Sequence, residues 1–157
     1  MKIRIAGFNP ESIVDGKGIR FVIYTQGCPH HCPGCHNPST HDFNGGTEYD
    51  TADIVRMLDS THLITGITLS GGEPFAQYEA CMEIAKKAKE RNLSVWCYTG
   101  YDFSEVIGNP LLRFVDVLVD GRFDESKKSL DLRFRGSTNQ RVIDVQKSFK
   151  MKETVLF

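Results

Sequence analysis

Three cysteines are the residues of this sequence whose type and spacing most clearly indicate chemistry. Cys28, Cys32 and Cys35 follow a C-x₃-C-x₂-C pattern, so their sulfurs can meet at one small inorganic group without the closure of a long loop. An iron–sulfur cube has four iron corners, and an electron carrier normally covers each corner with a thiolate. Three thiolates leave one iron open, and an open metal position can bind and transform a ligand. The spacing therefore predicts a catalytic [4Fe–4S] cluster.

Two other uses of these cysteines are weighed against the cluster. Three thiolates and one imidazole also form a structural zinc site. The histidines in this segment are His30, His31, His36 and His41. Zinc sites usually draw their ligands from two separated pairs, and this sequence has no second pair. A non-catalytic zinc-binding interaction protein and a simple electron carrier with a fully ligated cluster remain as alternatives. Disulfides are disfavoured by the odd count of five cysteines.

Composition sets the class of protein. The chain has 157 residues, of which 40% are hydrophobic and 25% are charged, so we expect one globular domain spanning 1–157. Nineteen basic and twenty acidic residues give a formal net charge of −1, which provides no general attraction to nucleic acid or to an anionic membrane. No apolar run reaches the length of a membrane span. The start of the chain shows no leader pattern, so we expect a cytoplasmic location.

Four β-prone runs define the expected architecture. They cover residues 20–25, 64–69, 93–98 and 114–119. Helices or long crossovers separate them, which predicts a parallel sheet with right-handed connections. We also expect a short edge strand at 2–6, a last strand at 141–145, and helices beginning at Asp50 or Thr51, near 77 and near 103. Cys81 and Cys97 fall on apolar faces and are predicted to fill the core.

Each of the four runs is followed by an unusual loop. The loops are the cysteine segment, Gly71-Gly72-Glu73-Pro74, Thr99-Gly100-Tyr101 and Asp120-Gly121-Arg122-Phe123. The carboxyl ends of parallel strands lie at one edge, where ligands of α/β proteins bind. A closed barrel of eight βα units needs about 250 residues, so we expect an open, partial barrel. Its open side leaves room for a large substrate, such as a loop of another protein.

The order of these motifs resembles a known family. Cys28-x₃-Cys32-x₂-Cys35 followed one βα unit later by Gly71-Gly72-Glu73-Pro74 is similar to the radical S-adenosylmethionine enzymes, which implies an α/β fold with an open partial (β/α) barrel and a mostly parallel sheet. Residues 14–20 and Cys35-His36-Asn37 resemble the glycyl-radical-enzyme activases among them. Within that group, the resemblance is greatest to the activators of anaerobic ribonucleoside-triphosphate reductases. It rests on residues 119–123 and 135–141, and on Gly34, where many members of the wider family have an aromatic residue.

The resemblance implies a mechanism. Cys28, Cys32 and Cys35 would hold three irons of a [4Fe–4S] cluster, and the fourth iron would bind the amino and carboxylate groups of S-adenosylmethionine. An electron from a donor such as flavodoxin would lead to a 5′-deoxyadenosyl radical, which takes hydrogen from a glycine of the reductase's catalytic subunit. The nearest rival is activation of another glycyl-radical enzyme, such as pyruvate formate-lyase.

The resemblance also assigns roles to individual residues. The expected S-adenosylmethionine contacts are Gly34, Cys35, His36, Asn37, Gly71, Gly72, Glu73 and Asp120. Asp15 and Lys17 are candidates for contact with the incoming glycine loop, although a hairpin turn explains the same residues. The polar segment 124–141 either docks the partner or closes the fold.

Alanine substitutions separate ligand cysteines from core cysteines. We expect Cys28→Ala, Cys32→Ala or Cys35→Ala to abolish cluster assembly and activity, because each removes a thiolate ligand. Cys81→Ala or Cys97→Ala removes only packing, so these variants keep the cluster at a cost in stability. Iron and sulfide analysis after anaerobic reconstitution checks both. Full activity of Cys32→Ala would refute the ligand assignment.

Overall fold

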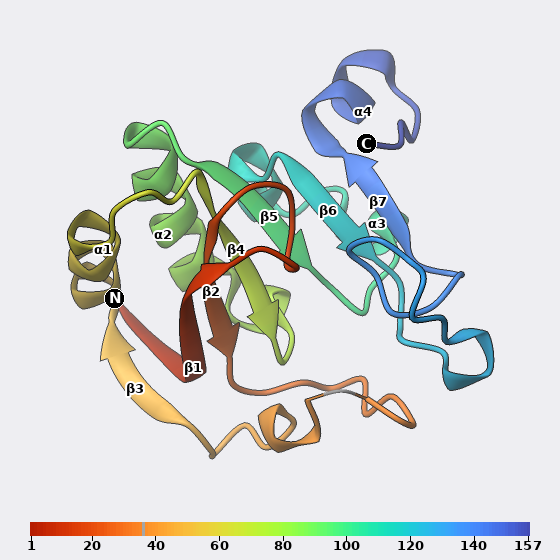
Figure 1. Ribbon diagram of the computed structural model, residues 1–157, viewed down its shortest axis with the longest axis horizontal. Coiled ribbons are helices and arrows are strands. Elements are labelled where there is room, and N and C mark those ends of the chain that lie inside the picture. The colour runs from red at the N-terminus through yellow and green to blue at the C-terminus, as the bar shows by residue number, and fades with distance from the viewer. Residues whose placement is uncertain (36) are drawn as a thin grey trace.

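The structure is a computed structural model that describes residues 1–35 and 37–157, built on one seven-stranded sheet in the order β3-β1-β2-β4-β5-β6-β7 (Figure 1). The strands are β1 (Lys2–Ser12), β2 (Arg20–Thr25), β3 (Thr47–Asp50), β4 (Gly66–Gly71), β5 (Ser94–Tyr98), β6 (Val117–Asp120) and β7 (Arg141–Asp144). The helices are α1 (Thr51–Ser60), α2 (Tyr78–Glu90), α3 (Phe103–Val106) and α4 (Val145–Met151). Short 3₁₀ turns cover Pro38–Thr40, Pro74–Gln77, Pro110–Phe114 and Glu125–Lys127.

The centre of the sheet is parallel. Strands β2, β4, β5 and β6 correspond to the four predicted runs, and each pairs in parallel with the next. In this register Ile23 lies opposite Leu69, and Leu69 lies opposite Cys97. The outer strands β3, β1 and β7 pair antiparallel. The protein is therefore a mixed α/β fold with an open sheet, and the prediction of a mostly parallel sheet is confirmed at its centre.

The amino-terminal strand differs from the sequence prediction. Residues 2–6 were expected to form a short edge strand, but β1 continues to Ser12 and lies between β3 and β2. The edge is formed by β3, whose sequence Thr-Glu-Tyr-Asp is exposed or half-buried along its whole length. Four polar residues show no alternation of apolar and polar side chains, so the sequence of this segment does not predict a strand. Its pairing with β1 is what makes it a strand.

Helix starts follow the predicted capping chemistry. The Asp50 carboxylate accepts a hydrogen bond from the Ala52 backbone N–H at 3.0 Å and caps α1, as expected. Asp102 and Glu105 form a reciprocal capping box at α3. Within residues 1–35 and 37–157, no helix is both long and apolar enough to cross a lipid bilayer.

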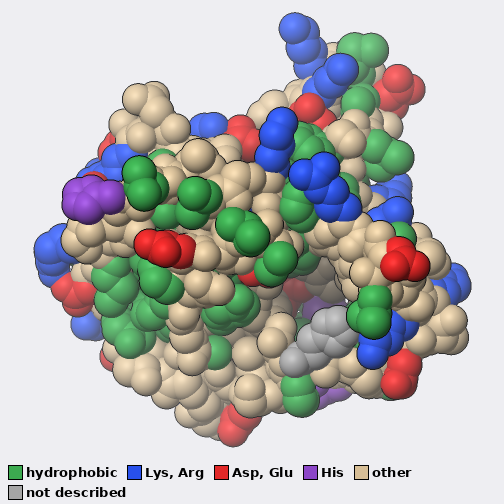
Figure 2. Space-filling model, in the orientation of Figure 1, with side chains coloured by type: hydrophobic (Ala, Val, Ile, Leu, Met, Phe, Trp, Pro, Cys, Tyr) green, Lys and Arg blue, Asp and Glu red, His purple; other side chains and the backbone are tan. Residues whose placement is uncertain are grey.

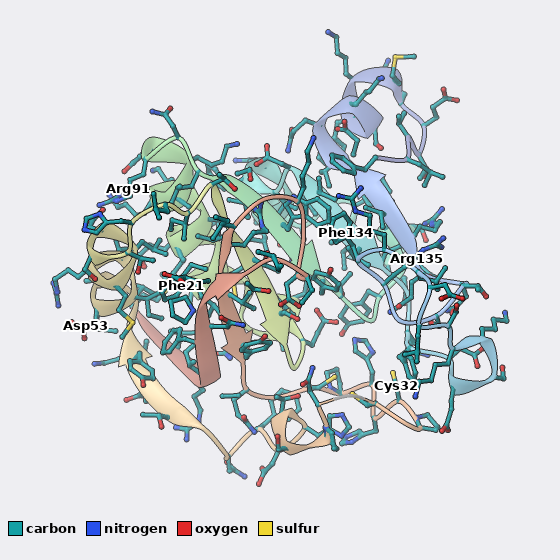
Figure 3. The ribbon with its side chains drawn as sticks, in the orientation of Figure 1. Phe21, Cys32, Asp53, Arg91, Phe134 and Arg135 are labelled. Atoms are coloured by element: carbon teal, nitrogen blue, oxygen red, sulfur yellow. The ribbon has the colours of Figure 1, made fainter. Side chains whose placement is uncertain are left out.

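One face of the sheet forms the main core beneath α1 and α2 (Figure 1). Alternate strand residues such as Ile67 and Leu69 are fully buried against Ile84 of α2. Cys81 and Cys97 are also fully buried in this core, which confirms their predicted packing role. Asp53 of α1 and Arg91, which directly follows α2, lie on the side of the molecule away from Cys32 (Figure 3).

The opposite face is covered in part by the β1–β2 loop, residues 13–19. The buried Arg20 guanidinium holds this loop, because it donates to the Lys17 carbonyl at 2.7 Å and to the Ile67 carbonyl of β4 at 2.7 Å. The Thr68 hydroxyl donates to the Asp15 carbonyl at 2.6 Å. Gly16, at φ +125°, passes so close to Arg20 that a Cβ would clash. Burial lowers the pKa of Arg20 to about 10. The segment is thus the connection of a β-hairpin, as the sequence predicts, since Ser12 of β1 pairs with Arg20 of β2, and these hydrogen bonds hold it as a cover over this face.

The buried thiol of Cys81 should make stability depend on alkaline pH. Burial raises its pKa from 9.0 to about 12. The unfolded chain loses this proton near pH 9 whereas the folded chain keeps it, so the free energy of unfolding falls as pH rises from about 9 to about 12. Cys81→Ala should reduce that slope by about one proton. Urea unfolding of the metal-free chains between pH 8 and 11 measures it, and equal slopes would contradict the assignment.

Candidate functional site

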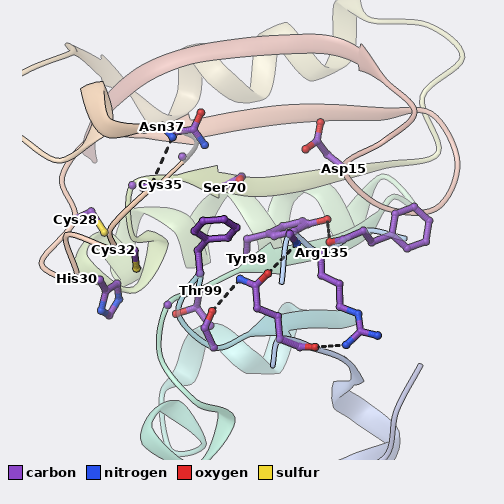
Figure 4. Close-up of a pocket in the computed structure, with 18 of the residues that line it drawn as sticks. Asp15, Cys28, His30, Cys32, Cys35, Asn37, Ser70, Tyr98, Thr99 and Arg135 are labelled. Carbon is purple, nitrogen blue, oxygen red and sulfur yellow. Dashed lines mark hydrogen bonds between the residues drawn. The ribbon is translucent and has the colours of Figure 1, made fainter. Parts of the chain in front are cut away.

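A cavity of about 350 Å³ opens at the carboxyl ends of the four parallel strands. It lies beside the cysteine loop, residues 27–37, where Figure 2 shows the face of the molecule hollowed. All four predicted loops contribute lining residues, among them Cys28, Cys32, Cys35, Gly71, Gly72, Thr99, Gly100, Gly121 and Phe123. Figure 4 shows Cys28 and Cys32 at one end of the cavity and Asp15 and Arg135 at the other. The predicted convergence of the loops at one edge is present in the structure.

The cysteine loop is shaped by its own backbone. Residues with positive φ curl it, namely Gly27 at 104°, His31 at 49° and Gly34 at 71°. The Cys28 N–H donates to the His41 carbonyl at 3.2 Å, and the Cys35 N–H donates to the Cys32 carbonyl at 3.1 Å. Cys28 is buried, whereas Cys32 and Cys35 are half-buried, and all three thiols are free. The loop therefore presents three thiols to one cavity.

Burial raises the pKa of the Cys28 and Cys32 thiols. Backbone N–H groups of His30 and Phe123 oppose this shift at Cys28 and Cys32 respectively. In the metal-free protein these groups are therefore held as neutral thiols. A thiolate forms here when a cation replaces the proton, so metal binding releases protons.

Glu73, predicted to meet the methionyl group, is fully buried. Its Oε1 accepts hydrogen bonds from the Thr99 hydroxyl at 2.8 Å and the Gly100 N–H at 2.8 Å, and it lies 2.7 Å from His30 Nε2. Its Oε2 accepts from the Phe75 N–H at 3.1 Å. The carboxylate is thus engaged within the protein, and it is the backbone of this turn that faces the cavity. A side-chain contact of Glu73 with a ligand stays a prediction.

The two glycines before Glu73 allow a close approach of two loops. Gly71 has φ +91°, and the Gly72 N–H donates to the Thr25 carbonyl at 2.8 Å. A Cβ on Gly72 would lie 2.4 Å from the Gly27 carbonyl oxygen. The Glu73 N–H donates to that same oxygen at 2.8 Å. Turn 71–74 is therefore joined backbone to backbone with the cysteine loop.

Among the other residues predicted to contact S-adenosylmethionine or the glycine loop, some line the cavity and others do not. Asn37 lines the cavity, and its N–H donates to Cys35 Sγ at 3.4 Å. Gly34 is exposed, and a Cβ there would clash with the Glu125 carboxylate. His36 lies outside the described residues. Of the two loop candidates, Asp15 lines the cavity, whereas the Lys17 side chain is exposed.

Asp120 has partners within the protein. Its carboxylate accepts from the Phe103 N–H at 2.8 Å and from Arg141 Nη2 at 2.6 Å, and it is 1% exposed. The hydrogen bond to Asp120 raises the pKa of Arg141. The neighbouring Gly121 lines the cavity, so this strand end contributes backbone while the Asp120 carboxylate orders α3 and β7.

Several lining residues were not predicted. The Tyr98 hydroxyl donates to the Phe134 carbonyl at 2.6 Å, and burial raises the pKa of Tyr98. Phe134, Arg135 and Gln140 belong to the polar segment and line the cavity. Phe134 packs edge-on against Trp96 of β5, with ring centroids 5.0 Å apart, and Figure 3 shows Phe134 and Arg135 near each other and apart from Cys32. The sequence signals for Phe134, Arg135 and Gln140 were the concentration of polar residues at 133–141 and the family resemblance of 135–141, neither of which reveals which side chains turn inward.

Comparison with known proteins gives a consistent result. The family described as the 4Fe-4S single cluster domain matches residues 14–143. The anaerobic ribonucleoside-triphosphate reductase-activating protein of Vibrio cholerae is 33% identical over 143 residues, covering 85% of this chain and 92% of that protein. The protein of the same name from phage T4 is 36% identical over 141 residues, with coverage of 85% and 88%. The one from Escherichia coli K12 is 33% identical over 143 residues, with coverage of 85% and 93%.

The chain belongs to the family of anaerobic ribonucleoside-triphosphate reductase-activating proteins. Members of the matching domain family hold one 4Fe-4S cluster, and the residues present fit such a group. Three thiols from a single loop line one cavity, whose other walls combine backbone and polar groups with apolar side chains such as Val14 and Phe134. Among residues 1–35 and 37–157, no three His, Cys, Asp or Glu side chains gather closely enough to hold a single metal ion. The match to a 4Fe-4S family does not favour the zinc alternative, and a cube takes each thiolate on a different iron.

The contact between turn 71–74 and the cysteine loop of this family member can be tested with glycine variants. Gly72→Ala places a methyl group against the Gly27 backbone, which cannot rotate away, so we expect a loss of about 1–3 kcal/mol in the free energy of unfolding and less iron bound after reconstitution. Gly108→Ala is the matched control, because nothing lies within 4 Å of its Cβ position. Urea unfolding and iron analysis of both variants decide whether the contact matters.

Proposed function

We propose that this chain activates an anaerobic ribonucleoside-triphosphate reductase by generating a glycyl radical in its catalytic subunit. The observation that carries the proposal is the meeting of three free cysteines with the glycine-rich turn 71–74 at one open cavity. The names of the relatives support the choice of target. The enzyme is accordingly an oxidoreductase of the radical S-adenosylmethionine class.

A bound [4Fe–4S] cluster with S-adenosylmethionine supplies the one-electron cleavage that yields a 5′-deoxyadenosyl radical. The protein's part is to bind, orient and shield. Cys28, Cys32 and Cys35 hold three irons. Ser70 and the backbone of Gly71 and Gly72 line the cavity. The two glycines are suited to the polar methionyl end, because glycine lets a backbone approach a ligand closely. The proposed cofactor contacts also include Gly34, His36, Asn37, Glu73 and Asp120.

The apolar and aromatic part of the cavity suits the rest of the ligand and the incoming glycine loop. Tyr98 and Phe134 line it beside Val14 of the β1–β2 loop. Arg135 provides a cation at the end opposite the cysteines. Asp15 lies on that same side and is the proposed contact of the partner's glycine loop, with Lys17 at the exposed tip.

The wider assignments follow from the same proposal. The open sheet is a partial (β/α) barrel of the radical S-adenosylmethionine type, and residues 1–157 act as one domain. The protein acts in the cytoplasm, where a reduced donor such as flavodoxin supplies the electron. The parallel centre of the sheet and the 4Fe-4S family match support the barrel assignment.

Anaerobic reconstitution with iron and sulfide tests the function. Reduction in the presence of S-adenosylmethionine should release 5′-deoxyadenosine, and addition of the reductase's catalytic subunit should give the electron paramagnetic resonance doublet of a glycyl radical. Cys32→Ala should give neither product. A radical formed on pyruvate formate-lyase instead of the reductase would overturn the choice of partner. Stoichiometric zinc without iron, on a chain that leaves S-adenosylmethionine intact, would overturn the activity itself.

A further inference from the structure

The side chain of His30 is buried although it belongs to an exposed part of the cysteine loop. Its side chain is 4% exposed, whereas its neighbours Pro29 and His31 are exposed. The ring lies edge-on to Tyr101, with centroids 4.5 Å apart at 79°. Gly100 makes the space for it, because a Cβ at Gly100 would lie 2.4 Å from the His30 ring. The imidazole therefore fills a site that is shaped to receive it.

The hydrogen bonds of His30 define which ring nitrogen carries hydrogen. Arg122 Nε lies 3.4 Å from Nδ1, and an arginine Nε can only donate, so Nδ1 is the acceptor. Nε2 therefore carries the hydrogen and donates it to Glu73 Oε1 at 2.7 Å. This bond is charge-assisted, a class roughly twice as strong as bonds between neutral groups. His30 thus satisfies one lone pair of a fully buried carboxylate.

The partners of His30 come from every other loop of the site. Glu73 follows β4, Gly100 and Tyr101 follow β5, and Arg122 follows β6. One side chain, placed between the ligand cysteines Cys28 and Cys32, thereby contacts all three neighbouring loops. Figure 4 shows its ring beside Cys28 and Cys32, at the end of the cavity where the thiols lie.

We propose that His30 is a positioning residue that fixes the cysteine loop against the three neighbouring loops. It keeps the three thiolates at a set distance from turn 71–74, and so couples cluster geometry to the binding of S-adenosylmethionine. Its ring lines the cavity, but both ring nitrogens are engaged by Glu73 and Arg122, so it acts through the loop that it fixes. The identity of the ligand rests on the proposed function, whereas the fixing of the loop rests on contacts that exist in the metal-free chain. An apolar residue of similar size would fill the space but leave the buried Glu73 Oε1 with one donor fewer, which is costly.

The first test uses the metal-free chain and three histidine variants. His30→Asn is too short to reach Glu73, His30→Gln can place an amide N–H near the Nε2 position, and His31→Asn is the matched control at an exposed left-handed position that asparagine tolerates. Alkylation rates of Cys28 are measured by mass spectrometry under anaerobic, reducing conditions. We expect about tenfold faster labelling in His30→Asn, because loss of a charge-assisted hydrogen bond raises the population of the opened loop. His31→Asn should match the wild type, and His30→Gln should lie close to it.

The chain contains its own control for unfolding. Cys81 and Cys97 are fully buried in the main core and become labelled only when the sheet opens. Fast labelling of Cys28 with protected Cys81 and Cys97 reports local release of the loop. If His30→Asn makes Cys81 and Cys97 as reactive as Cys28, the test is repeated with Gly100→Ala. The methyl group of that variant displaces the imidazole, while every hydrogen-bonding group remains in the chain.

The second test follows the ligand. Reconstituted His30→Asn keeps all three cysteines and should bind iron near the wild-type ratio, but the change in the reduced cluster's electron paramagnetic resonance spectrum should need about tenfold more S-adenosylmethionine. His30→Gln should restore the wild-type titration. A wild-type chain whose cluster ignores S-adenosylmethionine refutes the proposed function and leaves the labelling test standing. Unchanged Cys28 labelling in His30→Asn overturns the positioning role, and loss of iron with unchanged labelling would make His30 a ligand instead.

Discussion

The site depends on the need to compensate one buried negative charge. Glu73 has no exposed surface, and an ionised carboxylate removed from water is strongly destabilising unless hydrogen bonds satisfy it. Its donors come from the cysteine loop, from its own turn and from the loop after β5. These segments can supply donors only in one relative arrangement. The carboxylate therefore defines where the cysteines lie relative to the glycine-rich turn, although it does not face the cavity.

The sequence predicts the centre of the fold because the information there is local. Four β-prone runs and their following loops correspond to β2, β4, β5 and β6, and the loops meet at one edge because parallel strands align their carboxyl ends. The outer part was predicted less well. β3 is too polar and too short to carry a pattern, and β1 became an internal strand only because β3 pairs with it. Arg20 reads as the first residue of a strand, and its place under the β1–β2 loop depends on Lys17, Thr68 and Ser94 together.

The site shows the same division between local and distant information. The cysteines could be identified from residue type and spacing, since a shared inorganic ligand requires only a short loop. The orientation of acidic side chains could not be identified in this way. Asp120 ends a strand that points at the cavity, yet its carboxylate bonds Arg141, and that pairing exists because β7 returns antiparallel beside β6. From the sequence, His30 was a candidate zinc ligand. Its burial depends on the absence of a side chain at Gly100, and this matters only once β4 and β5 lie side by side.

The separation of His30 and Glu73 along the chain, 43 residues, sets an order for maturation. A newly made chain presents its three cysteines within one short segment, so iron could reach them before any sheet exists. His30 finds its carboxylate only after β2 has paired with β4 across a helical crossover, a non-local step that is slow compared with loop closure. Metal delivered before the sheet forms would bind a loop whose shape is not yet defined, whereas metal delivered after sheet formation would bind a preformed site. Biogenesis of the holoprotein is therefore best served when chain folding precedes insertion of the inorganic group.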